Sequence, residues 1–393
     1  MSTSGAGPGA NSILDFADRV DIPSIERRLP EGPAFIADPM LGVVRLSAAT
    51  DFDSVGLLRL LSLAASRRKA GRQVRFELPR DPYARHVLRR SRFAVAAEMV
   101  LRTPFRLLVR REDLAYFGEE APLQTVSSGE NSALGSVVSY LAEQGHFGLS
   151  PYRVDSQKGL TRMLDKEVAC WRSYAMVELL TKVLREQAID VSRVIVQELV
   201  ANVVEHPLSS VAVIASQIKL PVVGAQGAGD VLTIAAWDDG SSIIETLRRC
   251  LNEVGSVRAW SPDVADTFAV SRTASPGRSV RYASDWTPGP TASDEELLLA
   301  SLFPGITRKL SRNSVDSLSP AAPGTDYGYG LFALYKTAID HFGGSVELQC
   351  GRIMLRLDRA LETGPYRAEI MTRENFDLLS GTFVTVNLPV YDG

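Results

Sequence analysis

The sequence IDVSRVIVQELVANVVEHP, residues 189–207, decides the fold that we expect for the second half of this chain. Its apolar residues Ile195, Leu199 and Val203 recur at every fourth position, and this spacing predicts an amphipathic helix with one buried face. An acid or a hydroxyl at its start can cap the helix, and Pro207 ends it. The segment therefore packs one apolar stripe against a core.

A polar row runs beside that stripe at the same interval and consists of Glu198, Asn202 and His206. Burying these side chains without partners would be costly. A pocket that holds a hydrated cation and phosphates would provide partners, because the amide oxygen of Asn202 can bind magnesium and Glu198 can orient a water or a hydroxyl. Taken alone, the row could equally be the polar residues that border the buried face of any amphipathic helix.

Residues 231–242, VLTIAAWDDGSS, read as an apolar strand that ends in two acids and a glycine. A carboxylate at the end of a strand, here Asp238, can accept a hydrogen bond from the exocyclic amine of adenine. Gly240 would let the backbone approach the ring. Asp-Asp-Gly is also an ordinary turn signal, so this segment is informative only together with others.

Residues 324–348, GTDYGYGLFALYKTAIDHFGGSVEL, place two glycines directly before a predicted helix. The helix runs from about Leu331 to Phe342, and Gly328 and Gly330 leave backbone amides free at its positive end. Such amides can cradle phosphates. Glycine-rich turns before helices are common, so the order of the three segments matters more than any one of them.

This order, an E-x-x-x-N-x-x-x-H helix, a strand ending in D-x-G and a later G-x-G-L helix, resembles the superfamily of gyrase, Hsp90, histidine kinases and MutL, called GHKL. The resemblance covers about residues 170–390 and implies a Bergerat-type α/β sandwich, a mixed sheet with helices on one face, that binds ATP and Mg²⁺. It implies Glu198 as general base, Asn202 as magnesium ligand and Asp238 as adenine acceptor. The further residues that it implies to contact the nucleotide are His206, Gly240, Tyr327, Gly328, Gly330, Leu331 and Thr382.

Two residues depart from the family's glycine pattern. Ser242 replaces the last glycine of D-x-G-x-G, and Asp326 replaces the first glycine of G-x-G-x-G. Both changes narrow the backbone freedom that close phosphate contact uses, and Asp326 adds a negative charge beside the phosphates. They leave open a site that binds nucleotide weakly or without hydrolysis.

The first part of the chain predicts a small α/β domain at residues 33–112. A strand at 42–47, a helix that Asp53 or Ser54 can cap, a strand at 74–78 and a helix at 83–97 follow one another. The segments VVRLSAATDFDSVGLLRLL, GRQVRFELP and ARHVLRRSRF resemble STAS domains, which antagonise anti-sigma factors, although a phosphorylatable serine has no clear counterpart. The arginines here predict a solvated helix face or a docking surface for an acidic partner.

The remaining segments complete the expected organisation. Residues 1–32 read as a flexible tail, 113–163 as a linker with a helix, and 164–393 as the nucleotide-binding domain with a lid at 243–325. Within that lid a helix and turn at 295–310 could fold over the nucleotide. The cations that could reach the phosphates from there, and that more often are solvated, are Arg308, Lys309 and Arg312.

Composition bounds the function without deciding it. The chain has 45% hydrophobic and 23% charged residues, which fits a globular protein. Its net charge of -3 is too small to imply nucleic acid or an acidic membrane as the obligatory partner. Cys170, Cys250 and Cys350 lie far apart and read as buried thiols. Because no stretch reaches the roughly 18 apolar residues that span a bilayer, we expect a cytoplasmic protein.

The resemblance also narrows the expected function. The helix at 164–187 contains no histidine and His146 lies in a turn-like context, which disfavours an autophosphorylating histidine kinase. The arrangement that ends at His206 instead resembles anti-sigma-factor serine kinases, whose partners are STAS domains. We expect an ATP–Mg-binding regulatory protein, an ATPase or a serine/threonine protein kinase, that acts through a protein partner. The alternatives are an ATP-hydrolysing clamp that dimerises through its lid, like Hsp90 or MutL, and a nucleotide sensor without turnover.

Overall fold

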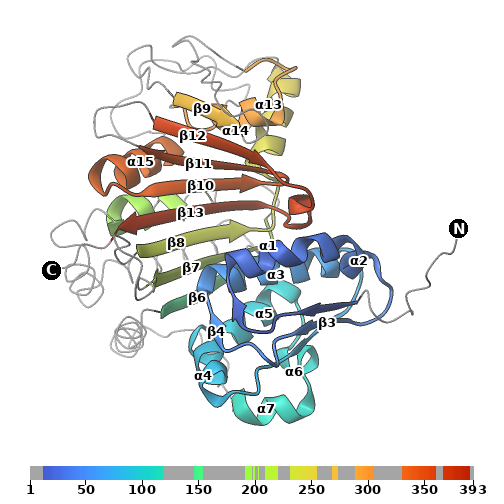
Figure 1. Ribbon diagram of the computed structural model, residues 1–393. Helices are drawn as coiled ribbons and strands as arrows, with labels where there is room; N and C mark the ends of the chain where they lie inside the picture. Colours follow the sequence, from blue (N-terminus) through green and yellow to red (C-terminus); the bar gives the residue numbers. More distant parts are fainter. Residues whose placement is uncertain are drawn as a thin grey trace, which may run out of the picture. The chain divides into compact units, whose positions relative to one another are not determined.

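The computed structural model describes residues 12–117, 146–153, 191–196, 198–199, 202, 209–219, 231–254, 268–272, 288–303, 330–359 and 366–389. They form a mixed α/β protein (Figure 1). The chain divides into two compact units. Unit 1 comprises Met1–Arg153, Val211–Ile218 and Glu374–Ser380, and unit 2 comprises Val154–Ser210, Lys219–Arg373 and Gly381–Gly393.

Unit 1 is built around a sheet of three parallel strands in the order β1-β3-β5. A second, two-stranded parallel pair joins β2 to β4. The strands are β1 (Ile13–Asp15), β2 (Arg19–Val20), β3 (Gly42–Arg45), β4 (Asp51–Phe52) and β5 (Val74–Glu77). The helices are α1 (Ile22–Arg28), η1 (Leu29–Glu31), α2 (Gly32–Ala37), α3 (Ser54–Lys69), α4 (Pro82–Arg90), α5 (Phe93–Leu101), α6 (Phe105–Leu108) and α7 (Arg111–Phe117).

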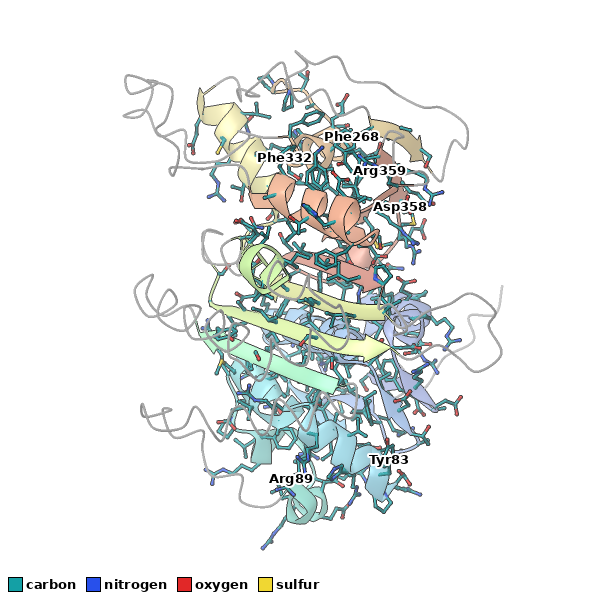
Figure 2. The ribbon with its side chains drawn as sticks, turned by 90° about the vertical axis from the view of Figure 1, so that its left-hand side faces the viewer. Tyr83, Arg89, Phe268, Phe332, Asp358 and Arg359 are labelled. Carbon is teal, nitrogen blue, oxygen red and sulfur yellow. The ribbon has the colours of Figure 1, made fainter. Side chains whose placement is uncertain are left out.

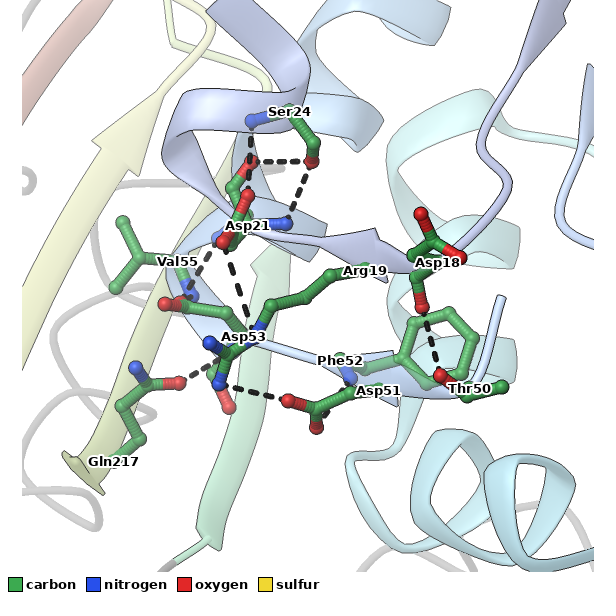
Figure 3. Close-up of polar contacts among 12 residues, drawn as sticks. Asp18, Arg19, Asp21, Ser24, Thr50, Asp51, Phe52, Asp53, Val55 and Gln217 are labelled. Carbon is green, nitrogen blue, oxygen red and sulfur yellow. Dashed lines mark hydrogen bonds and ion pairs between the residues drawn. The ribbon is translucent and has the colours of Figure 1, made fainter. Parts of the chain in front are cut away.

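The predicted strand–helix–strand–helix order of unit 1 is confirmed, with two refinements. Asp53 is the residue that caps α3, since its Oδ1 accepts hydrogen bonds from the backbone nitrogens of Val55 at 2.8 Å and Gly56 at 3.1 Å (Figure 3). Ser54 is the first residue of the helix. The single helix expected at 83–97 is two helices, because Arg92 adopts the left-handed conformation, at φ 60°, between α4 and α5.

The expectation of a flexible tail up to residue 32 is wrong for residues 12–32. Leu14 and Ile25 are fully buried, and α1 packs against α3. Asp21 and Ser24 form a capping box at the start of α1, in which each side chain accepts a hydrogen bond from the other residue's backbone nitrogen at 2.9 Å (Figure 3). A strand of three residues is too short to show periodicity in the sequence, although the capping box was visible there.

Two later segments of the chain also belong to unit 1. Strand β6 (His146–Arg153) pairs antiparallel with β7 (Val211–Lys219), and both α3 and α5 pack against β6. The Gln217 side chain accepts a hydrogen bond from the backbone of Ser54 at 2.6 Å. The segment that includes Leu378 also packs here, since the hydroxyl of Ser66 donates to its carbonyl. From the sequence we expected β7 and the Leu378 segment in the nucleotide-binding domain and β6 in the linker at 113–163.

Unit 2 contains six strands in the order β8-β13-β10-β11-β12-β9, all antiparallel neighbours except the parallel pair β12/β9. The predicted strand ending at Asp238 is confirmed as β8, and Thr382 is the first residue of β13. The strands are β8 (Val231–Asp238), β9 (Phe268–Arg272), β10 (Ser345–Cys350), β11 (Ile353–Arg359), β12 (Tyr366–Thr372) and β13 (Thr382–Pro389).

Helical segments pack on this sheet. The predicted helix after Gly330 is confirmed as α15 (Gly330–Lys336), which continues as the π-helical η5 (Thr337–His341). Segment η5 packs against β10 and β13, and the π-helical η3 (Val191–Val196) packs against α15. Figure 2 shows α15 and η3 on the same face of the sheet. The described part of residues 189–207 is therefore helical, as predicted.

Three described parts of the segment predicted to be a lid at 243–325 are regular structure. They are α13 (Ile243–Val254), the strand β9 and α14 (Asp294–Ala300). Helix α14 packs against α13 and β11, with Leu297, Leu298 and Leu299 buried, so this leucine run belongs to a core. None of the helices in the described ranges is both long and apolar enough to cross a bilayer.

Candidate functional site

The start of α15 lies against the polar row predicted from the sequence. A β-carbon built on Gly330 would lie 2.6 Å from Oε2 of Glu198 and 3.6 Å from Oδ1 of Asn202. All three residues are half-buried. The first and third sequence segments thus meet at Gly330, and a side chain at this position would require the Glu198 carboxylate to move. We call Glu198, Asn202 and Gly330 the Glu198 cluster.

The amide of Asn202 has an unused hydrogen-bond donor. Its Nδ2 is buried and has no hydrogen-bond partner among the residues that the structure describes. Such a donor costs about 1–3 kcal/mol when it stays unsatisfied. A phosphate oxygen is an acceptor that would satisfy it, and the amide oxygen is of the type that binds Mg²⁺. The cluster therefore fits a phosphate group with a hard cation.

Asp238, at the end of β8, accepts hydrogen bonds from two described neighbours. Its Oδ1 accepts from the hydroxyl of Ser209 and from the backbone nitrogen of Gly240, both at 2.8 Å. The side chains of Asp238 and Ser209 are buried. Next to them, the backbone nitrogen of Ser210 donates to Asp239 at 2.6 Å. Two consecutive serines thus position two consecutive aspartates.

Glycines enclose Asp238 on both sides. A β-carbon on Gly240 would lie 2.4 Å from the Ser209 hydroxyl oxygen. Gly381 has φ +89°, and a β-carbon there would lie 1.7 Å from the carbonyl oxygen of Asp238. Both positions therefore require glycine. Gly381 requires it for a second reason, because its backbone lies in the left-handed region. The carboxylate of Asp238 is consequently fixed before any ligand arrives.

Thr382 lies directly opposite Asp238 in the β8/β13 pair. Its buried hydroxyl accepts a hydrogen bond from the backbone nitrogen of Ile243 at 3.3 Å and contacts the thiol of Cys350 at 4.0 Å. Burial raises the pKa of the Cys350 thiol to about 12, so the thiol is neutral at physiological pH. We call Asp238, Ser209, Gly240 and Thr382 the Asp238 cluster.

The departure at Ser242 has a structural explanation. Its hydroxyl accepts from the backbone nitrogen of Glu245 at 3.2 Å, and its own backbone nitrogen donates to Oε2 of Glu245 at 2.8 Å. This is a capping box at the start of α13. The serine therefore serves the helix where the family has a glycine, and the S-x-x-E pattern in the sequence could have shown this.

Six of the ten site residues predicted from the sequence lie in these two clusters. Glu198, Asn202 and Gly330 form one, and Asp238, Gly240 and Thr382 belong to the other. Leu331 is the second residue of α15 and half-exposed. Sequence reasoning missed Ser209 and Ser210, for which the only signal was a serine pair after Pro207. Outside the described residues lie His206, Tyr327, Gly328, Asp326, Arg308, Lys309 and Arg312.

The described residues contain no group of three His, Cys, Asp or Glu side chains that could hold a metal ion. A cation at Asn202 would therefore complete its coordination with phosphate oxygens and water, which suits Mg²⁺. No protein-family model, no curated protein and no solved structure matches this chain. The function has to be inferred from the residues of the two clusters.

Proposed function

We propose that unit 2 binds ATP with Mg²⁺ through the Glu198 and Asp238 clusters. The observation that carries this proposal is the approach of Gly330 to Glu198 and Asn202, with the buried amide donor of Asn202 beside it. A packed core has no reason to place an acid, an unsatisfied amide and a bare glycine together at the start of a helix. A phosphate-binding site does, because the amide and the helix amides supply donors for phosphate oxygens.

The Asp238 cluster supplies the base-recognition end of the proposed site. A carboxylate oxygen has two acceptor positions, so Asp238 can keep its internal hydrogen bonds and accept another from the exocyclic amine of adenine. Ser209 and Gly240 hold the carboxylate in place, which removes the entropic cost of orienting it on binding. Guanine carries a carbonyl at the corresponding position, so Asp238 would repel it.

The Glu198 cluster supplies the phosphate end. Asn202 would hold the cation through its amide oxygen, and the cation would neutralise charge on the phosphates. Glu198 can orient a water or a protein hydroxyl and take its proton. Its neighbour Gly330 keeps space open at the carboxylate. These residues serve hydrolysis and transfer to a protein hydroxyl equally well.

The proposal also includes the specific fold of each unit and the superfamily. Two features support a Bergerat-type domain of the GHKL superfamily. The Glu198 helix, the strand ending at Asp238 and the helix at Gly330 follow one another along the chain, and helices pack on one face of a mixed sheet. The three parallel strands and helices of unit 1 support a STAS-like module. We therefore propose a cytoplasmic regulatory protein, similar to the anti-sigma-factor serine kinases, that acts on a protein partner.

One observation favours a second function, a nucleotide sensor without turnover. Ser242 is committed to capping α13, so the backbone at this position is fixed by the helix and not by a nucleotide. A site with fewer backbone contacts to the phosphates would stabilise the transition state of transfer less than it stabilises bound ATP. In that case bound ATP would persist intact.

Titration calorimetry with ATP and Mg²⁺ on the full chain tests the proposal. We expect binding by the wild-type protein, strongly weakened binding by Asn202→Ala, and loss of binding by Asp238→Ala. Asp358→Asn, which removes a carboxylate from β11 in the same unit, serves as the control and should bind normally. Absence of binding by the wild-type protein would refute the proposal.

The fate of the γ-phosphate separates the alternatives. ATP labelled on the γ-phosphate is incubated with the protein, alone and with candidate partner proteins. Label on a partner's serine or threonine, lost in Glu198→Gln, identifies a kinase. Release of inorganic phosphate without protein labelling identifies an ATPase, and intact ATP after long incubation identifies the sensor.

A further inference from the structure

One end of unit 1 carries an unusual concentration of arginine. Residues 72–113 contain eleven arginines, five acids and no lysine, in a chain whose overall net charge is -3. Helices α4, α6 and α7, which this segment forms, lie together at one end of unit 1 (Figure 1). Positive charge is therefore concentrated on this end of a chain that is otherwise acidic.

Part of this arginine set has an internal role. Arg85 forms an ion pair with Asp113 at 3.3 Å, which ties α4 to α7, and both side chains are largely buried. Arg110 pairs with Glu77 at the end of β5. These two arginines hold the helices against the sheet. They explain why the helices stay together but not why the segment carries nine further arginines.

Four of the exposed arginines have no such role within the described part of the chain. The side chains of Arg80, Arg102, Arg106 and Arg111 are exposed and form no ion pair with another residue of the described ranges. An exposed lysine would serve solubility equally well, yet the segment contains none. Arginine is the cation that binds carboxylates in a bidentate geometry and that stacks on planar groups.

Two large apolar side chains are exposed on the same helices. Tyr83 on α4 is 65% exposed and Leu107 on α6 is 62% exposed, and Met40 is the only other large apolar residue so exposed in the described part of the chain. Figure 2 shows Tyr83 and Arg89 at the same end of unit 1. Tyrosine and arginine are enriched, and lysine depleted, in protein–protein interfaces, where they often dominate the binding energy.

We infer that this surface docks an acidic protein partner. The surface, which we call the arginine end, is formed by the exposed side chains of Arg80, Tyr83, Arg89, Arg106, Leu107 and Arg111. Its arginines would pair with carboxylates, while Tyr83 and Leu107 would pack on apolar residues of the partner. Charges in unit 1 as a whole are nearly balanced, unlike those of a nucleic-acid-binding domain. The inference does not depend on nucleotide binding by unit 2.

Site-specific crosslinking identifies the partner. A photoreactive phenylalanine analogue replaces Tyr83 in the full chain, expressed in its source organism, and the same analogue at Arg68, an exposed position on α3, is the control. The protein crosslinked only from position 83 is then purified and its binding to the unlabelled chain is measured by calorimetry. We expect Arg89→Glu to weaken that binding about tenfold or more, Tyr83→Ala to weaken it similarly, and Arg68→Glu to leave it unchanged.

Each outcome decides the inference. Two results together establish the docking surface. The crosslinked segment of the partner is acidic, and changing an opposing carboxylate of the partner to lysine restores binding to the Arg89→Glu variant. Any of three results would overturn the inference. These are crosslinks to nucleic acid, identical crosslinks from positions 68 and 83, and a purified partner that binds Arg89→Glu and Tyr83→Ala as tightly as it binds the wild-type chain. Circular dichroism of each variant verifies that unit 1 is folded, and both substituted side chains are exposed, which favours folding.

Discussion

The α-carbon of Gly330 faces the carboxylate of Glu198 so closely that a β-carbon on Gly330 would lie 2.6 Å from Oε2. Real β-carbons do not approach an oxygen atom to this distance. With the Glu198 carboxylate in this position, helix α15 and the polar row therefore meet this closely because residue 330 is glycine. Since the meeting point carries the proposed function, it also provides its most direct test.

Gly330→Ala should displace the Glu198 carboxylate. We expect ATP turnover or phosphate transfer, whichever the wild-type protein shows, to fall about tenfold or more, because a base moved by about 1 Å loses its alignment. Because the atom that the new β-carbon meets is the end of a flexible side chain, the loss of unfolding free energy should be at or below the lower end of the roughly 1–3 kcal/mol that overpacking costs. Gly289→Ala is the matched control, since a β-carbon there meets nothing within 4 Å. Equal behaviour of the two variants in both measurements would contradict the close approach.

Ser209→Ala should weaken the proposed adenine contact without removing it. The variant loses the hydrogen bond from the Ser209 hydroxyl to Asp238, and one such bond is worth about 0.5–1.5 kcal/mol. We expect ATP affinity to fall roughly twofold to tenfold and discrimination against GTP to decline, as measured by calorimetry with both nucleotides. Ser210→Ala, which affects Asp239 instead, should leave both values near wild type. A larger effect from Ser210→Ala would assign base recognition to Asp239.

Cys350 should make the stability of unit 2 depend on pH in the alkaline range. The folded protein keeps the thiol protonated because burial raises its pKa from 9.0 to about 12, whereas the unfolded chain ionises near its usual value. Above pH 9 the unfolded state thus binds fewer protons, and stability is lost as pH rises towards 12. The stability difference between wild type and Cys350→Ala in urea unfolding should be constant up to pH 8.5 and then decline by up to about 1.4 kcal/mol per pH unit.

Comparison with Cys350→Ala cancels the titration of all other groups. An unchanged difference between pH 8 and pH 10.5 would show that the thiol is not buried as described. Alkylation gives an independent measurement, because a protonated and buried thiol should resist iodoacetamide at pH 8 until the chain unfolds.

Arg67 should be essential for the stability of unit 1. Its side chain is buried, donates to the carbonyls of Gln73 and Met40, and stacks over the ring of Phe35 at 4.8 Å. Arg67→Ala would leave both carbonyls without this donor and create a cavity, so we expect a loss of about 3 kcal/mol or more. Urea unfolding measures this loss. The adjacent Arg68→Ala, on the exposed side of α3, should change stability by less than about 0.5 kcal/mol.

The local elements of this protein follow from short stretches of its sequence. Three short patterns each predicted an element that the structure contains. They are the apolar spacing around Ile195 and Leu199, the apolar run that ends at Asp238, and the glycine before Leu331. These predictions succeed because hydrophobic periodicity and caps act over one or two turns of chain. Where an element has only three residues, as at Ile13–Asp15, that signal is absent and the strand was missed.

The contacts that form the candidate site were decided by tertiary structure. Asn202 and Gly330 lie more than a hundred residues apart in the sequence, and nothing local in either segment specifies that they meet. The bond from Ser209 to Asp238, and the addition of β9 to the sheet beside β12, depend in the same way on packing between distant segments. The sequence by itself determined which helices and strands carry polar residues at their edges. Only the folded chain decided which edges face each other, because burial of apolar faces and strand pairing act between elements and not within them.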